Sequence, residues 1–85
     1  MKLNILTPEG SIYSGDAYGV QLPGVTGSFE VLDKHAPLIA ALTKGRLKVL
    51  EGSLNGTATY YDIQGGFVEV LNNNVTVLVE GANKV

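Results

Sequence analysis

The chain has 85 residues with no shift in composition along it, which leaves room for a single domain over residues 1–85. Its formal net charge of −2 is spread without basic or acidic runs, so no electrostatic footprint for nucleic acid is present. It has no cysteine, which excludes disulfide frameworks, thiol catalysis and most zinc sites. Eleven glycines and three prolines beside 45% hydrophobic residues favour strands with frequent turns.

The chain opens with the period-two alternation of strands that bury one face. Lys2–Thr7 alternates rather than forming a continuous apolar run, which argues against a signal peptide, a transit peptide and a membrane-spanning helix. Further strands are predicted at Ser11–Tyr13 and Tyr18–Leu22, with a turn at Ser14–Asp16 between them. Pro23 and Gly24 are expected to stop the second of these.

The middle of the chain, from Gly24 to Gly56, predicts two strands separated by loops. Gly24–Gly27 and Asp33–Pro37 are expected to be loops on either side of a strand at Phe29–Val31. Leu38–Leu42 fits either a strand or a helical turn. A half-exposed strand is predicted to begin at Gly45, because apolar and basic residues alternate after it. The remaining loop of this region, at the tip of a hairpin, is Glu51–Gly56.

The last third reads as a meander. Thr57–Ile63 is rich in β-branched and aromatic residues, and Gly65 with Gly66 is expected to break it before Phe67–Leu71. Three asparagines, which tolerate left-handed backbone angles, suit a tight reversal into Val75–Glu80. About eight to ten short strands and no long amphipathic helix predict an all-β fold, a flattened antiparallel β-sandwich.

Candidate catalytic residues are few. His35 is the single histidine, and neither a G-x-S-x-G nucleophile elbow nor a metal-ligand cluster accompanies it, so a surface or structural role is favoured. Gly24–Gly27 lacks the helix and the lysine of a phosphate-binding loop. Asp16 and Asp33 are interpreted as turn residues rather than paired acids. These observations argue against an enzyme and against a bound cofactor or metal.

The aromatic residues mostly occupy alternating strand positions. We therefore expect them to pack in the core or against cross-strand neighbours. Tyr60 and Tyr61 are adjacent and must point to opposite faces of a sheet, so one should be buried and the other exposed.

Four segments in order carry a resemblance to a known family: TPEGSIYSG at residues 7–15, LPGVTGSFEVL at 22–32, HAPLIAAL at 35–42 and GGFVEVLNNNVTVL at 65–78. Together they resemble the N-terminal domain of the epsilon subunit of rotary ATP synthases. The resemblance implies a ten-stranded β-sandwich at the foot of the central stalk. It further implies a non-catalytic subunit that binds the gamma subunit and the ring of c subunits, and couples proton-driven rotation to ATP synthesis.

Site residues carry over from this resemblance position by position. Thr26, Gly27, Ser28 and Phe29 match the segment that faces the c ring, and Ser28 stands where an acidic residue is common; Glu30 is a candidate substitute if its register lets it reach. The positions that match those lying toward gamma are Thr7, His35 and Ala40. The Asp33-Lys34 pair replaces the Pro-Gly turn that is common before HAP, so the shape of that loop is expected to differ.

The family's C-terminal pair of helices has no counterpart after Glu80, so tail-mediated inhibition of ATP hydrolysis is expected to be missing. The resemblance implies that the subunit lies at the cytoplasmic face of a bacterial cell membrane and is attached to that membrane only through the other subunits of the complex. It predicts an exposed apolar sandwich face or edge. One alternative is a stand-alone β-sandwich binding module, which predicts an exposed aromatic platform. The other is a small hydrolase, which predicts an acidic or nucleophilic residue with a perturbed pKa beside His35.

Overall fold

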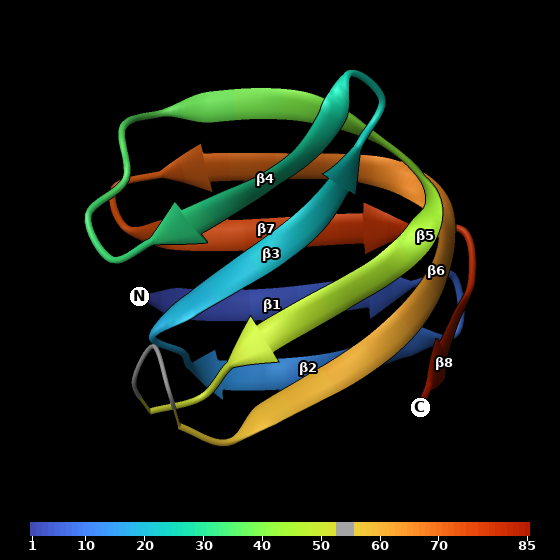
Figure 1. The fold of residues 1–85 in the computed structure, drawn as a ribbon, viewed down its shortest axis with the longest axis horizontal. Helices are drawn as coiled ribbons and strands as arrows, with labels where there is room; N and C mark the ends of the chain where they lie inside the picture. Colours follow the sequence, from blue (N-terminus) through green and yellow to red (C-terminus); the bar gives the residue numbers. More distant parts are fainter. Residues whose placement is uncertain (53–55) are drawn as a thin grey trace.

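The computed structural model describes residues 1–52 and 56–85, and in that part of the chain it contains eight strands (Figure 1). Their bounds are β1 Lys2–Thr7, β2 Gly10–Asp16, β3 Gly19–Gly24, β4 Gly27–Leu32, β5 Leu38–Leu50, β6 Ala58–Leu71, β7 Asn74–Val79 and β8 Ala82–Lys84. No helix able to cross a membrane is found within these described ranges.

The strands follow the order β2-β1-β7-β6-β5-β3-β4, and β8 pairs with β6. The two longest strands, β5 and β6, pair with each other and curve together around one edge of the molecule (Figure 1). Each therefore contributes to both layers of a sandwich. The first layer contains β2, β1, β7, the second half of β6 and the first half of β5. The second layer contains β8, the other halves of β6 and β5, β3 and β4. The predicted all-β sandwich is confirmed.

The bend of β6 depends on two glycines. Gly65 and Gly66 have φ values of +105° and +151°, which side chains rarely adopt. A Cβ on Gly66 would lie 1.9 Å from the carbonyl oxygen of Leu78 on the neighbouring strand. The prediction that these glycines end the strand was wrong, because they let β6 turn from one layer to the other while it keeps its pairing with β5.

The core lies between the layers and is built from the inward residues of the alternating strands. The most fully buried of them are Leu3, Ile5, Val20, Leu22, Val31, Leu47, Val49, Ile63, Val68 and Val77, all with 0% exposure. Each such side chain contributes roughly 1.5 to 3 kcal/mol through burial. Among the described residues no buried polar or charged side chain interrupts this core.

Several local predictions need correction. β2 runs through Asp16, so the turn predicted at Ser14–Asp16 is wrong. β5 starts at Leu38 and does not pause before Gly45. The β1–β7 pair is parallel, which is the one departure from the predicted antiparallel sandwich among the described strand pairs. The final residues form β8, a strand that no pattern indicated, because its pairing with β6 rather than its composition makes it a strand.

Other predictions hold. The last two predicted strands, Phe67–Leu71 and Val75–Glu80, pair antiparallel as expected, although the predicted three-strand meander reduces to two strands because Thr57–Ile63 is continuous with Phe67–Leu71 in β6. Asn72 and Asn73 take φ values of 50° and 61° in the reversal between β6 and β7. Tyr61 is 5% exposed and Tyr60 is 38% exposed, as their opposite orientations require. The predicted hairpin tip at Glu51–Gly56 includes residues 53–55, which lie outside the described residues.

Candidate interaction surfaces

An apolar row crosses the outer face of the first layer. The strand register places Leu6 of β1 opposite Leu78 of β7, Leu78 opposite Phe67 of β6, and Phe67 opposite Ala41 of β5. Phe67 is 58% exposed and Leu78 is 51% exposed, while Ala41 is also exposed and Leu6 is half-buried. We call these four residues the outer-face row. Of the two packing arrangements expected for aromatic residues, Phe67 therefore has the cross-strand one and lies outside the core.

More apolar surface continues from the row. Ile39, two residues before Ala41 on β5, is 74% exposed, and Leu71 at the end of β6 is 49% exposed. At the other end, a shallow hollow of about 370 Å³ adjoins Leu78 and Phe67 and is also lined by Thr7 and Pro8. The apolar surface thus reaches from β5 to the turn that follows β1.

Acidic side chains flank the outer-face row, and one of them, Glu69, lies directly opposite Ile39 within the wider apolar surface. Glu69 is two residues from Phe67 on β6, and Glu80 is two residues beyond Leu78, so both belong to the same outer face. Both are exposed. A partner that covers the outer-face row would therefore meet negative charge on both sides of it.

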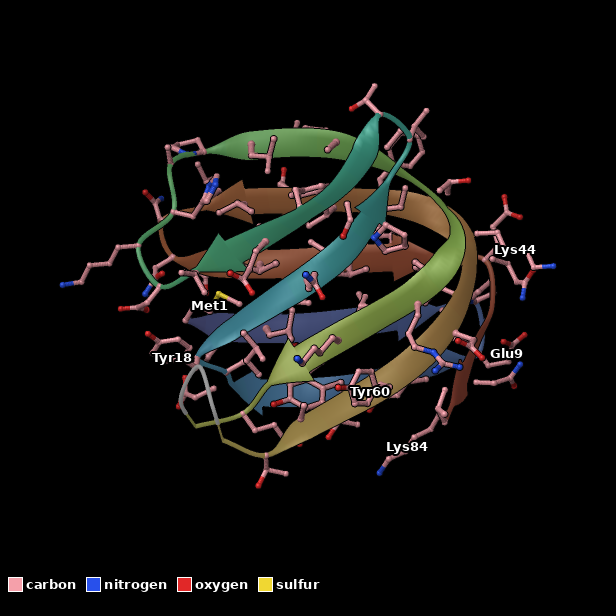
Figure 2. The ribbon with its side chains drawn as sticks, in the orientation of Figure 1. Met1, Glu9, Tyr18, Lys44, Tyr60 and Lys84 are labelled. Carbon is pink, nitrogen blue, oxygen red and sulfur yellow. The ribbon has the colours of Figure 1, made fainter. Side chains whose placement is uncertain are left out.

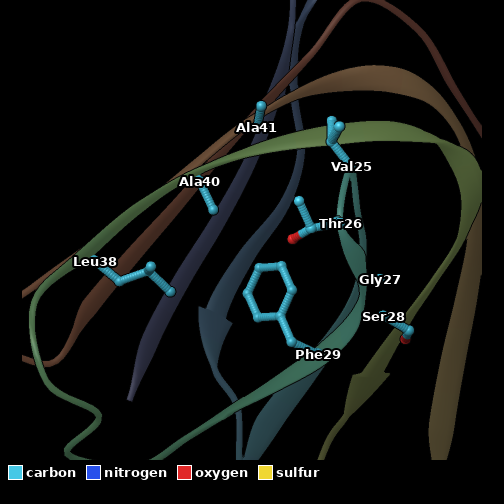
Figure 3. Close-up of a pocket in the computed structure, with 9 residues that line it drawn as sticks. Val25, Thr26, Gly27, Ser28, Phe29, Leu38, Ala40 and Ala41 are labelled. Carbon is cyan, nitrogen blue, oxygen red and sulfur yellow. The ribbon is translucent and has the colours of Figure 1, made fainter.

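A second hollow, of about 600 Å³, lies where the β3–β4 turn approaches β5 (Figure 3). Figure 3 shows the Phe29 ring in this hollow, with Leu38 and Ala40 of β5 directed toward it. Gly24 permits the arrangement, because a Cβ there would lie 2.8 Å from the Phe29 ring. The turn itself consists of Val25 and Thr26, both exposed.

The structure groups the site residues differently from the sequence. Ala40, which matches a position toward gamma, lines the same hollow as the Thr26–Phe29 segment that matches the c-ring loop. Thr7 lines the other hollow. His35 is exposed in the turn after β4, at the end of that strand opposite to the Thr26–Phe29 segment. Ser28 and Glu30 are two residues apart on β4 and exposed, so they share its outer face.

The turn that carries His35 is held by distant residues. The Asn73 side chain donates to Asp33 Oδ1 at 2.8 Å, and the Met1 amino group lies 2.9 Å from the same oxygen. The hydrogen bond from Asn73, and then that from the amino group, hold the pKa of Asp33 below its ordinary value. His35 Nδ1 lies 2.7 Å from the carbonyl oxygen of Ala36.

The outer face of the second layer is polar. Arg46 donates to both carboxylate oxygens of Asp62, at 2.9 and 3.3 Å. Lys48 Nζ lies 5.8 Å from the ring centroid of Tyr60, which is labelled in Figure 2. The hydrogen bond to Asp62 raises the pKa of Arg46, and the same bond lowers the pKa of Asp62. These charged groups already have partners within the chain.

The described residues form surfaces suited to binding another protein. Within residues 1–52 and 56–85, no three His, Asp or Glu side chains are grouped so that they could hold a metal ion. What the fold supplies is a packed two-layer scaffold with one apolar outer face, one charged outer face and an exposed turn beside a hollow. This combination defines an all-β interaction domain.

The comparisons with known proteins give this domain a family. The model of the family "ATP synthase, Delta/Epsilon chain, beta-sandwich domain" matches residues 1–85, and the chain belongs to that family. Its members named as epsilon chains are non-catalytic stalk subunits of the ATP synthase.

The relatives are bacterial proteins named ATP synthase epsilon chain. That of Lawsonia intracellularis is 44% identical over 84 residues, which cover 99% of this chain and 61% of the relative. That of Halalkalibacterium halodurans is 39% identical, over 96% of this chain and 59% of the relative. The chain thus spans about three fifths of the length of these two. For the Caulobacter vibrioides protein, 38% identical, it covers 92% of the relative.

Two solved structures share the fold. A chain of the Euglena gracilis mitochondrial ATP synthase, in a cryo-EM structure of OSCP, F1 and the c-ring, aligns with a TM-score of 0.89 and 23% identity. The alignment covers 96% of this chain and 51% of that chain. A chain from the central stalk and c-ring structure of the Tetrahymena thermophila enzyme aligns with a TM-score of 0.83 and 20% identity, over 98% and 65%.

Sequence reasoning expected an exposed apolar face but did not locate it. The sequence of residues 74–79 did indicate such a surface. Val75, Val77 and Val79 alternate on the buried side of this strand, and Leu78 is an apolar residue on its exposed side. Ala41 and Phe67 likewise stand out of phase with buried Leu42 and Val68. An apolar residue on the solvent phase of a strand, repeated on neighbouring strands, marks such a surface.

Proposed function

We propose that this chain couples rotation of the c ring to the catalytic head of an ATP synthase by binding the gamma subunit and the c ring at once. The observation that carries the proposal is the outer-face row, an apolar strip across four adjacent strands of a rigid sandwich. Contiguous exposed apolar surface of this kind marks an interaction site in soluble proteins. The packed core supports the mechanical role, since close-packed interiors deform little.

The outer-face row is proposed to contact gamma. Phe67, Leu78 and neighbouring Ile39 each expose more than half of their surface, at 58%, 51% and 74%. Covering the exposed parts of these three side chains would contribute roughly 3 to 5 kcal/mol, before the costs of association are counted. Thr7, a position that the family resemblance assigns to gamma, lines the hollow at one end of the row and supports this assignment.

The acidic border specifies the chemistry of the surface that gamma presents. Glu69 and Glu80 lie on either side of the row and are exposed. An apolar strip on gamma flanked by Lys or Arg would satisfy both carboxylates at the rim, whereas a strip flanked by Asp or Glu would be repelled.

The exposed β3–β4 turn is proposed to contact the polar loops of the c ring. Thr26, Gly27 and Ser28 are exposed there, and the hollow beside them provides an apolar socket. Because Glu30 shares the outer face of β4 with Ser28, its carboxylate can serve where an acidic residue is missing at position 28. Proton-driven rotation and a place on the cytoplasmic face of a bacterial cell membrane follow from membership in such a complex.

Substituting Ser28 by Lys tests the assignment of this turn. It introduces positive charge where basic c-ring loops are expected, so attachment to c-ring-containing membranes should weaken while gamma binding stays within about twofold. Equal loss of both interactions would show that the two surfaces are wrongly assigned. Lys84→Glu, on β8 in the same layer but on a strand that pairs with β6 and not with β3 or β4, is the charge-changing control.

The central test of the proposed function is co-expression of this chain with the gamma subunit from the same source, followed by size-exclusion chromatography at moderate salt. Co-elution as a one-to-one complex is the expected result. Separation of the two proteins at micromolar concentration would contradict the proposal and would favour a stand-alone binding module.

A further inference from the structure

Two turns that are far apart in the sequence meet through one side chain. The turn after β4 contains Asp33 and Lys34 and leads directly into His35, while Asn73 lies in the reversal between β6 and β7. The side-chain amide of Asn73 bridges them with two hydrogen bonds. Its Nδ2 donates to Asp33 Oδ1 at 2.8 Å, and its Oδ1 accepts the backbone N–H of Lys34 at 2.6 Å.

The bridged turn has an unusual backbone. Lys34 has a φ of 64°, a left-handed conformation that non-glycine residues seldom adopt and that must be stabilised by their surroundings. The only local backbone hydrogen bond described for this turn runs from His35 N to Leu32 O, at 3.1 Å. The direct bond to the Lys34 N–H therefore comes from outside the turn, from Asn73.

Asn73 is itself well held. Its φ of 61° is one that asparagine tolerates better than most residues, and its carbonyl oxygen accepts the N–H of Lys2 at 3.1 Å. Its side chain is therefore presented from a fixed backbone, tied to the start of β1. A fixed donor and acceptor pair of this kind can impose a conformation on the exposed turn that it contacts.

We propose that Asn73 is a positioning residue that sets the conformation of the turn carrying His35. Asn73 fixes the left-handed backbone at Lys34 and the orientation of Asp33. Through these two residues it sets the direction of the chain after β4 and so the position of His35. The consequence for binding rests on the proposed function, in which His35 contacts gamma. The effect on the turn does not depend on any partner.

Asn72 provides the internal comparison. It shares the left-handed conformation, with a φ of 50°, but its side chain makes neither of the two bonds to the Asp33–Lys34 turn. If Asn73 acts only as a good residue for the β6–β7 reversal, the same substitution at either position should have the same effect. If Asn73 acts through its amide, only the change at position 73 should alter the turn before His35.

The test uses Asn73→Asp, which keeps an oxygen for the Lys34 N–H but replaces the donor toward Asp33 by a second carboxylate. Asp also tolerates the left-handed backbone, so the β6–β7 reversal is preserved. In nitrogen-15 NMR spectra of the chain alone, we expect shifted Lys34 and His35 amide signals. Repulsion from the Asp33 carboxylate should move the substituted side chain away from the Lys34 N–H, so the exchange rate of the Lys34 amide hydrogen should rise at least fivefold.

The swapped double variant D33N/N73D restores a donor facing an acceptor. Because Asp33→Asn alone also removes the carboxylate that the Met1 amino group contacts, that single variant is the reference: the swap should give the same Lys34 and His35 signals as Asp33→Asn and an exchange rate within about twofold of it. Asn72→Asp should leave the parent signals and rate unchanged. The proposal is overturned if Asn73→Asp and Asn72→Asp give the same spectrum around His35. It is also overturned if the folded swap variant differs from Asp33→Asn as much as Asn73→Asp differs from the parent.

Gamma binding separates this proposal from the proposed function. His35→Ala and Asn73→Asp should each weaken gamma binding severalfold, and the swap should recover it. If His35→Ala has no effect on gamma binding, the assignment of His35 to the gamma contact is wrong, while the NMR result still decides the role of Asn73. If His35→Ala weakens binding but Asn73→Asp does not, positioning by Asn73 is overturned.

Discussion

The two outer faces of the sandwich are made from the same two long strands but have opposite chemistry. On the first layer, β6 presents Phe67 to solvent beside Leu78, and no charged group within that row offsets the exposed apolar surface. On the second layer, the same strand presents Tyr60 and Asp62, which engage Lys48 and Arg46 of β5. The charged groups of one face have partners within the chain, and the exposed apolar side chains of the other face form the proposed binding surface.

The difference between the two faces is not explained by folding stability. Ion pairs between exposed side chains contribute little to stability, typically below about 1 kcal/mol, so the charged face is explained by solubility and not by folding. Exposed Phe67 and Ile39 likewise contribute little to the core. Their position across adjacent strands is the observation from which a contact with gamma is proposed.

The largest expected effect concerns the bend that joins the two faces. Gly66→Ala would place a Cβ 1.9 Å from the Leu78 carbonyl oxygen at a φ of +151°. We expect a loss of roughly 4 kcal/mol in the free energy of unfolding, as the sum of backbone strain and a clash with backbone. Chemical denaturation measures it, and Gly15→Ala, with open space around its Cβ, is the control. A loss below about 1 kcal/mol would show that the bend does not need glycine.

Next in size is the contrast between the two sides of β6. Ile63 is 0% exposed and Phe67 is 58% exposed. Ile63→Ala should cost roughly 3 kcal/mol through lost burial and a cavity, whereas Phe67→Ala should cost less than about 1 kcal/mol. Urea titrations followed by circular dichroism compare them. Similar losses for both variants would place the Phe67 ring in the core.

Charge reversal on each face sharpens the comparison further. Glu69→Lys should weaken gamma binding about three- to tenfold at low salt, because it removes negative charge beside the outer-face row. Asp62→Lys breaks the ion pair with Arg46 on the other face and should leave gamma binding within twofold. Affinity measured at two salt concentrations tests this. A stronger effect for Asp62→Lys would reverse the assignment of the faces.

The smallest expected effect is a loss of stability in acid. Hydrogen bonds from Asn73 and Arg46 lower the pKa values of Asp33 and Asp62 in the folded chain. A carboxyl group with a lowered folded pKa stabilises the protein above its unfolded pKa, and the contribution is lost below about pH 4 as the pH falls through the folded value. Thermal melts between pH 6 and pH 3 should show a smaller decrease for D33N/D62N. An equal decrease would assign the acid sensitivity to other groups.

Much of the fold could be predicted from the sequence because alternation and turn residues are local signals. The Asn72–Asn74 reversal and the opposite orientations of Tyr60 and Tyr61 follow from the backbone preferences of single residues. The continuity of β6 through Gly65 and Gly66 could not be predicted, since a glycine pair reads equally as a break or a bend. Nor could the parallel β1–β7 pair, which depends on contacts between opposite ends of the chain.

The candidate site could be predicted only in part. Exposed Ser28 and His35 follow from their turn and loop positions, and the functional roles given to them come from the family resemblance. The outer-face row depends on register, which places Leu6, Leu78 and Phe67 level across three strands. The bridge from Asn73 to the turn before His35 spans about half the chain, and no local pattern announces such a contact.

The most direct test of the central claim compares two exposed aromatic residues on the same strand. Phe67 and Tyr60 lie on β6, on the outer faces of different layers, and each can be replaced by Ala with little expected loss of stability. Calorimetric titration with the gamma subunit should show at least a tenfold weaker affinity for Phe67→Ala and less than a twofold change for Tyr60→Ala. Unchanged binding by Phe67→Ala, or a larger loss for Tyr60→Ala, would contradict the outer-face row as the gamma-binding surface.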